Sequence, residues 1–285
     1  MGSKASGGIK GPGGSKGAAG KKGKKTGSAA KTAKPKAPGT SPSFHPPAPP
    51  LAAQDHQLFR SRVAAIISHF CPETTAIWFL EILAKKTAEE WADVFVQYTP
   101  KKVRQMFSKT EPPSVDELLS FSSQKSSNFG AYMCLVVPLD NGHHHHIYGG
   151  SATSPFGGLH TRISAHQNPA IKQKEPNYFH NLLHQEDVRR RGYFFHVFDV
   201  PGLIPCPEDQ MTERRAICMI AEAVYTAWFG AYRAGASRVH ASQYQQCPYN
   251  INQLGWWGTC SHLLLEDKSK GDREMGGDMG GEMKI

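Results

Sequence analysis

Acidic residues and arginine are absent from residues 1–50, although this segment contains ten lysines between Lys4 and Lys36. Because these ten lysines exceed the formal net charge of the whole chain, +9, the other residues together carry about one negative charge. Large apolar side chains are also scarce there, and Gly, Ala, Pro and Ser fill most of the remaining positions. Such a segment cannot bury enough apolar surface to offset its ordering entropy, so residues 1–50 are predicted to form a disordered basic tail.

Long apolar runs and closely paired cysteines are missing as well. No run approaches the roughly 20 apolar residues that a membrane-spanning helix needs, and the N-terminus lacks a hydrophobic signal core. The six cysteines form no CxxC pair and no zinc-finger spacing, which favours a reducing intracellular compartment. We therefore expect an intracellular protein with no membrane partner.

The basic tail has two interpretations. It is either a solubilising linker or a polycationic arm that neutralises the phosphates of a nucleic acid. Its Lys21-Lys22-Gly23-Lys24-Lys25 stretch also matches a short nuclear import signal, a pattern with many chance occurrences. The tail therefore favours a nuclear location and DNA as a partner, without deciding between the two interpretations.

Apolar residues at helical spacing predict a helical extension over residues 54–125. In residues 88–98, four apolar side chains recur at i, i+3, i+4 and i+7: Trp91, Val94, Phe95 and Tyr98. This spacing is one face of an amphipathic helix, and we interpret it as core. A further helix is predicted over residues 101–108, and Ser114 with Glu117 forms a candidate capping box.

A β-hairpin is predicted after this helical segment. The apolar run Ala131–Leu139 indicates a buried strand. Asp140-Asn141-Gly142 follows it, and Asn-Gly is a strong signal for a tight hairpin turn. The returning run His145–Tyr148 is expected to end at Gly149-Gly150, where the chain can bend sharply or a ligand can approach the backbone.

A short helix is predicted just beyond the hairpin. Arg162 and His166 are four positions apart in it, so both side chains project from one face. The hairpin itself carries Tyr132 in its first strand and Tyr148 in its second. The sequence therefore predicts an arginine and a histidine that project together next to two strand tyrosines.

Another helix and a third strand are predicted further along the chain. The helix spans about Tyr178–Gln185, and the aromatic run Gly192–Asp199 indicates the strand. Arg189-Arg190-Arg191 precede this strand. These arginines form either a solvated cap or a grip on a phosphate backbone, and the sequence favours neither.

A single carboxylate stands out in the longest predicted helix, Met211–Arg233. This helix is apolar nearly all round, which predicts that it is buried. Glu222 is the one charge between Arg215 and Arg233. A buried carboxylate is costly unless it is paired, hydrogen-bonded or bound to a metal. Glu222 is therefore interpreted either as half of a structural ion pair or as a metal ligand.

Two tripeptides of the hairpin carry a family resemblance. Gly130-Ala131-Tyr132 in the first strand and Tyr148-Gly149-Gly150 in the second, followed by Arg162 in the next helix, resemble the signature of the GIY-YIG nuclease domain. The resemblance covers residues 129–266. It implies an α/β fold with a small mixed sheet flanked by helices, here preceded by the helical extension and the basic tail. Residues 268–285, rich in Gly and Met, are predicted to be a second disordered tail.

The resemblance also implies a function: a divalent-metal-dependent endonuclease that hydrolyses DNA phosphodiester bonds. It assigns the following site: Tyr132 as general base, Tyr148 beside the attacking water, Arg162 on the phosphate, His166 as proton relay, and Glu222 as ligand of Mg²⁺ or Mn²⁺. One carboxylate suits Mg²⁺, which keeps most of its waters. His166 has a second interpretation as a hydrogen-bonded core residue. No small-molecule cofactor is expected.

One position departs from the family. GIY-YIG domains commonly place an Asn in a turn after the long helix, whereas this chain has Cys260 in Trp257-Gly258-Thr259-Cys260. Asn250 and Asn252 lie upstream and are alternatives for that role. The departure leaves a second hypothesis open, a non-cleaving nucleic-acid-binding protein that keeps the fold and the basic tail.

Overall fold

The computed structural model describes residues 56–70, 75–121, 126–140, 142–154, 157–168, 170, 178–201, 208–233, 246–261 and 265. The two tails that the sequence predicts to be disordered, 1–50 and 268–285, lie outside the described residues. All described residues fall in one unit of the chain, 47–285. The boundary between the helical extension, 54–125, and the GIY-YIG-like domain, 129–266, stays a prediction.

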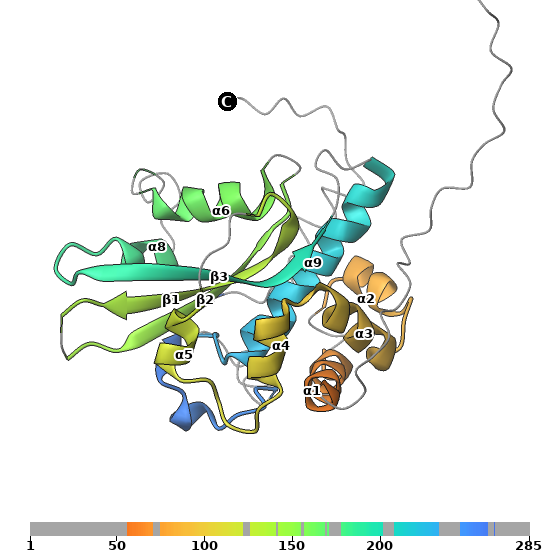
Figure 1. Cartoon of the computed structure of the whole chain (residues 1–285). Helices are drawn as coiled ribbons and strands as arrows, with labels where there is room; N and C mark the ends of the chain where they lie inside the picture. Colours follow the sequence, from red (N-terminus) through yellow and green to blue (C-terminus); the bar gives the residue numbers. More distant parts are fainter. Residues whose placement is uncertain are drawn as a thin grey trace, which may run out of the picture. The chain divides into compact units, whose positions relative to one another are not determined.

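A four-stranded mixed sheet forms the centre of the described structure (Figure 1). Its strands are β1 (Phe129–Pro138), β2 (His145–Ala152), β3 (Arg190–Val200) and β4 (Trp256–Gly258), in the order β3-β1-β2-β4. β1 pairs antiparallel with β2 and β3, and the short β4 pairs parallel with β2. The predicted fold class is confirmed at this level: a mixed α/β fold with a small mixed sheet flanked by helices.

The second strand continues beyond the point at which the sequence predicts its end. Gly149 and Gly150 lie inside β2, which runs on to Ala152. Gly150 pairs with Tyr132 across the ladder, and any β-carbon on Gly150 would collide with the Tyr132 hydroxyl. Glycine is therefore required here for the close approach of a neighbouring side chain and does not end the strand.

Different helices cover the two faces of the sheet. Tyr132 faces α6 (Gly158–Gln167), whose His166 contacts its hydroxyl. Successive residues of a strand point to opposite faces. The neighbouring position on β2, Gly149, accordingly faces Thr226 of α9 (Glu208–Trp228). Figure 1 shows α6 on one side of the sheet and α4 and α5 on the other.

The C-terminal half of the long helix α9 is buried on all sides, as its composition predicts. Every residue from Ile220 to Trp228 is buried. The helix ends at Trp228 rather than at Arg233, because Gly230 takes a positive φ of 56° and turns the chain. The strand-like segment that follows places Tyr232 in a bridge with Cys260.

The helical extension covers the side of α9 that faces away from the sheet. Its elements are α1 (Gln57–Ser68), α2 (Ile77–Leu83), α3 (Ala88–Tyr98), α4 (Lys101–Phe107) and α5 (Val115–Leu119). Trp228 of α9 stacks on Phe59 of α1 and packs against Phe107 of α4. Tyr225 is hydrogen-bonded to Thr99 at 2.5 Å. These contacts explain why α9 is apolar all round.

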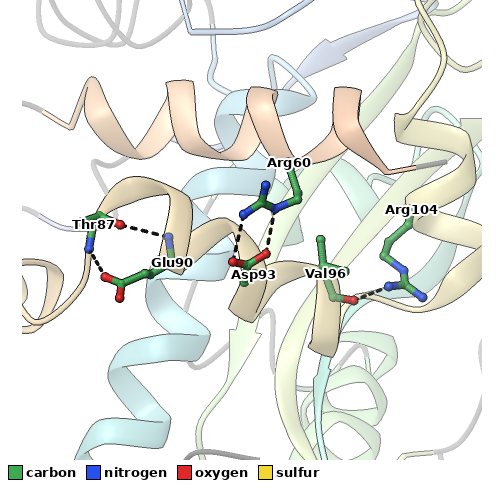
Figure 2. A network of polar contacts seen from close by, with 6 residues as sticks. All are labelled: Arg60, Thr87, Glu90, Asp93, Val96 and Arg104. Atoms are coloured by element: carbon green, nitrogen blue, oxygen red, sulfur yellow. Dashed lines mark hydrogen bonds and ion pairs between the residues drawn. The ribbon is translucent and has the colours of Figure 1, made fainter. Parts of the chain in front are cut away.

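Polar contacts hold the extension together (Figure 2). Arg60 of α1 reaches Asp93 of α3 with two hydrogen bonds of 2.7 and 2.9 Å. The pair is partly exposed, so it contributes at most about 1 kcal/mol. Thr87 and Glu90 form a complete capping box at the start of α3. The predicted box at Ser114 is only half made, since Glu117 bonds Lys109.

The predicted helix after α6 is α8 (Tyr178–Leu183), two residues shorter than the sequence indicates. A short 3-10 helix, Ile251–Gln253, precedes β4. Among the residues that the structure describes, no helix is long and apolar enough to cross a membrane.

Candidate functional site

A hydrogen-bonded chain of side chains lies on the α6 face of the sheet. The Tyr132 hydroxyl is 2.5 Å from His166 Nε2, and His166 Nδ1 is 2.7 Å from His180 Nε2. All three residues are almost fully buried. The strand β1 and the helices α6 and α8 each supply one of them, so the packing of these elements on one sheet face builds the chain.

Arg162 lies beside the same phenol. It is one turn before His166 on α6 and is the one exposed residue among the predicted site residues. Burial raises the pKa of Tyr132, while the positive charge of Arg162 and its hydrogen bond to the phenol lower it. Burial and, to a smaller extent, the positive charge of Arg162 lower the pKa of His166 to about 3. His166 is therefore a neutral imidazole at neutral pH.

Tyr148 occupies the next part of the site along β2. Its ring stacks on Phe179 of α8 at 4.1 Å between centroids and lies 6.5 Å from the Tyr132 ring. Burial raises the pKa of Tyr148 well above its usual value, with smaller contributions from Tyr132 and Glu222. Both phenols are consequently protonated at neutral pH in the absence of substrate.

Glu222 of α9 influences the two tyrosines electrostatically. Its side chain is 8% exposed, and its negative charge raises the pKa values of both Tyr132 and Tyr148. Desolvation lowers the pKa of Arg162, but the two phenols and Glu222 more than reverse this and raise it. Tyr132, Tyr148, Arg162 and Glu222 therefore lie within electrostatic reach of one another, and His166 joins them through Tyr132 and Arg162.

The two glycines of β2 open to opposite faces of the sheet. Gly149 opens towards Thr226 of α9, and Gly150 opens towards the Tyr132 hydroxyl. Successive residues of a strand alternate in this way, so the side chain of Tyr132 fills the space over Gly150 on the α6 face.

The donor set fits a hydrated divalent cation held by one carboxylate. Within the described part of the chain, no group of three or more His, Cys, Asp or Glu side chains could hold a metal ion. Mg²⁺ needs only one or two protein carboxylates and keeps several waters, so Glu222 alone meets that requirement. The binding of Mg²⁺ or Mn²⁺ here stays a prediction.

Cys260 lies at the back of the site. The backbone N–H of Gly149 donates to its sulfur at 3.4 Å, and the thiol donates to the Gly149 carbonyl at 3.8 Å. The β4 pairing has already ended at Ile147, so the thiol bonds β2 where the strand partner is missing. Burial raises the pKa of Cys260 to about 12, which keeps it a neutral thiol. Asn250, the alternative, caps the 3-10 helix instead.

We expect Cys260→Asn to keep the rate of DNA cleavage within about threefold of wild type or to raise it, because an amide supplies both an acceptor and a donor for Gly149. Cys260→Ala leaves the two Gly149 groups without their partner and should cost about 1–3 kcal/mol of stability. Nicking rates and thermal midpoints of both variants test this. A large loss of cleavage in Cys260→Ala with an unchanged midpoint would instead make the thiol itself functional.

Sequence reasoning missed His180 and His184. They lie four positions apart, the same spacing that singled out Arg162 and His166, and that spacing was the available signal. His180 bonds the imidazole of His166, whereas His184 Nε2 bonds the His166 carbonyl oxygen at 3.1 Å.

The three arginines 189–191, which the structure places at the start of β3, have separate contacts. Arg189 forms an exposed ion pair with Asp140 at 2.9 Å. Arg190 donates to Gln185, and Arg191 lies over the Tyr193 ring. Through these contacts the three arginines cap the end of the hairpin. A role in binding a phosphate backbone stays a prediction.

Neither a family model, nor a curated protein, nor a solved structure matches this chain.

Proposed function

We propose that this protein is a divalent-metal-dependent endonuclease that hydrolyses DNA phosphodiester bonds. The observation that carries the proposal is the environment of the Tyr132 hydroxyl, which Arg162 and His166 both bind and which Glu222 influences. The GIY-YIG resemblance of the tripeptides 130–132 and 148–150 supports it independently. Phosphodiester hydrolysis needs an activated water, a stabilised phosphate charge and a base, and these side chains supply each of them.

The proton that leaves the attacking water passes to Tyr132. A phenol with a raised pKa is a poor base alone, so its own proton must leave before it accepts another. The neutral His166 is 2.5 Å away and takes that proton on Nε2. Arg162 is always protonated and stabilises the phenolate that forms. Its guanidinium also matches the planar arrangement of two phosphate oxygens.

Tyr148 and Glu222 complete the assignment. Tyr148 orients the attacking water from the neighbouring strand position. Glu222 holds the divalent cation, which when bound acts as a Lewis acid on the phosphate and offsets the charge of the leaving oxygen.

A plasmid-nicking assay tests the proposal. Purified full-length protein is incubated with supercoiled, nicked and branched DNA in Mg²⁺, in Mn²⁺ and in excess chelator. We expect strand cleavage in either metal and none in chelator. Absence of metal-dependent cleavage on all three DNA forms would contradict the proposal.

A second candidate function is nucleic-acid binding without cleavage in the nucleus. The ten lysines of residues 1–50, with no acidic residue among them, favour it. This function requires no metal and no proton transfer. The two candidates share DNA as the partner and differ in the fate of the phosphodiester bond.

Deletion of residues 1–50 should weaken DNA binding without changing sequence preference. Each phosphate that a lysine neutralises releases counterions, so log K falls with log salt at a slope of about −0.9 per contact. The deletion should therefore flatten that slope, which titrations at several salt concentrations measure. An unchanged slope would exclude a DNA-binding role for the tail and leave the linker and import-signal interpretations.

A further inference from the structure

His180 lies behind the Tyr132–His166 pair, and the proposed mechanism does not use it. Its Nε2 is 2.7 Å from His166 Nδ1, and the residue is 3% exposed. The aromatic rings of Phe179 and Phe194 also pack around His166. A polar contact in such apolar surroundings has a defined direction, because each nitrogen either carries a hydrogen or accepts one.

The donors and acceptors around Tyr132 set this direction. Arg162 has only donors, so in its hydrogen bond with Tyr132 the phenol oxygen accepts. The phenol's own hydrogen then goes to His166 Nε2, its other hydrogen-bond partner among the described residues. An accepting imidazole nitrogen carries no hydrogen. The neutral ring of His166 therefore carries its single hydrogen on Nδ1.

The Nδ1 hydrogen of His166 faces His180. Several titratable or charged groups surround this ring: Tyr132 of β1, Tyr148 of β2, Arg162 of α6, and His180 and His184 of the α8 segment. Of these groups, His180 is the one within hydrogen-bond distance of Nδ1. His180 Nε2 must accept, because His166 Nε2 already accepts from the phenol.

We propose that His180 is a positioning residue for DNA cleavage, which accepts the Nδ1 hydrogen of His166 and thereby leaves His166 Nε2 able to take the proton of Tyr132. This inference rests on the proposed nuclease function. When the Tyr132 O–H bond breaks, an N–H bond forms at His166 Nε2. The resulting imidazolium donates to His180 through Nδ1, and the phenolate is balanced by Arg162.

Without His180, the Nδ1 hydrogen of His166 would be a buried donor without a partner. The ring would then gain by moving its hydrogen to Nε2, where it donates to the phenol oxygen. In that tautomer Nε2 has no lone pair for the proton of Tyr132. A wrong tautomer of a catalytic histidine is known to be costly, up to about ten-thousandfold in rate.

Two variants of full-length protein separate positioning from packing. Gln in His180→Gln places an amide oxygen near the position of Nε2 and accepts the same hydrogen, whereas Leu in His180→Leu accepts none. His160→Gln is the control, because His160 is an exposed residue of the same helix as His166 and lies outside the chain of hydrogen bonds. Nitrogen NMR of labelled histidine reads the His166 tautomer, and plasmid nicking reads the rate.

We expect the Nδ1–H tautomer in wild type, in His180→Gln and in the control, with cleavage within about threefold of wild type. His180→Leu should lose that tautomer and cleave about a hundredfold more slowly or worse. The rate loss of His180→Leu should become smaller at high pH, because hydroxide then replaces the base.

Three results would overturn the proposal: a wild-type His166 with its hydrogen on Nε2, a His180→Leu protein with the wild-type tautomer and rate, or a His180→Gln protein as slow as His180→Leu. A folded His180→Gln protein that cleaves about a hundredfold more slowly than wild type would overturn the proposal even if His180→Leu does not fold. A wild-type protein with the Nδ1–H tautomer and no cleavage of any DNA would refute the nuclease function while leaving the direction of this hydrogen bond established.

Discussion

Glu222→Gln is expected to slow metal-dependent nicking of DNA by about a thousandfold, the upper range for removal of one preorganised charge stabiliser. Gln keeps the length and hydrogen-bonding capacity of the side chain but lacks the negative charge that holds a cation. Since Glu222 belongs to α9 and is 8% exposed, DNA does not need to contact it. DNA affinity in the absence of metal should therefore stay close to that of wild type. Nicking rates and binding titrations on one preparation measure both effects.

The control for this variant is Glu213→Gln. Glu213 lies on the same helix, but its side chain is half-exposed and 4.0 Å from Lys85 Nζ. Its loss removes the same charge from α9 without touching the site. Circular dichroism and a thermal midpoint must accompany both variants, because removing a buried partner of a charge is itself destabilising. A folded Glu222→Gln protein that nicks DNA at the wild-type rate would refute the role of Glu222.

Arg162→Ala is expected to abolish nicking and also to weaken DNA binding. Arg162 lowers the pKa of Tyr132, so its removal raises that pKa and makes the phenolate harder to form at neutral pH. The variant also loses the planar fork that binds a phosphate. We expect a rate loss of about a thousandfold and a loss of affinity of about tenfold. Arg162→Lys should restore part of the affinity and little of the rate, because a point charge lacks the fork.

Lys85→Ala provides the matched removal of a positive charge. Lys85 is the exposed partner of Glu213 and lies outside the site. It should leave the rate unchanged and alter affinity only through net charge. Single-turnover cleavage from pH 6 to pH 10 tests the mechanism further. Arg162→Ala should recover part of its rate as pH rises, and a rate loss that is constant across this range would contradict the effect on Tyr132.

Local patterns in the sequence predict most of the elements that carry the candidate site. The apolar run and the Asn-Gly turn predict the hairpin, because strand and turn preferences depend on neighbouring residues. The four-residue spacing of Arg162 and His166 is a property of one helix, and the structure retains it. The apolar helix with one carboxylate was predicted from its local composition in the same way, and Glu222 is buried in it.

Other features depend on contacts between residues far apart in the chain, and no local pattern encodes them. β2 runs through Gly149-Gly150 because a side chain of β1 fills the space over Gly150. α9 ends at Trp228 because Gly230 turns the chain towards Cys260. The thiol of Cys260 meets Gly149 only once β4 has paired with β2.

The sequence by itself therefore determined the residue types of the site and the elements on which they lie. The tertiary structure alone decided that Glu222 lies within electrostatic reach of Tyr132, and that His180 stands behind His166. The physical reason is that the direction of a hydrogen bond and the reach of a charge depend on distance in space. That distance is set by how β1, α6, α8 and α9 pack together.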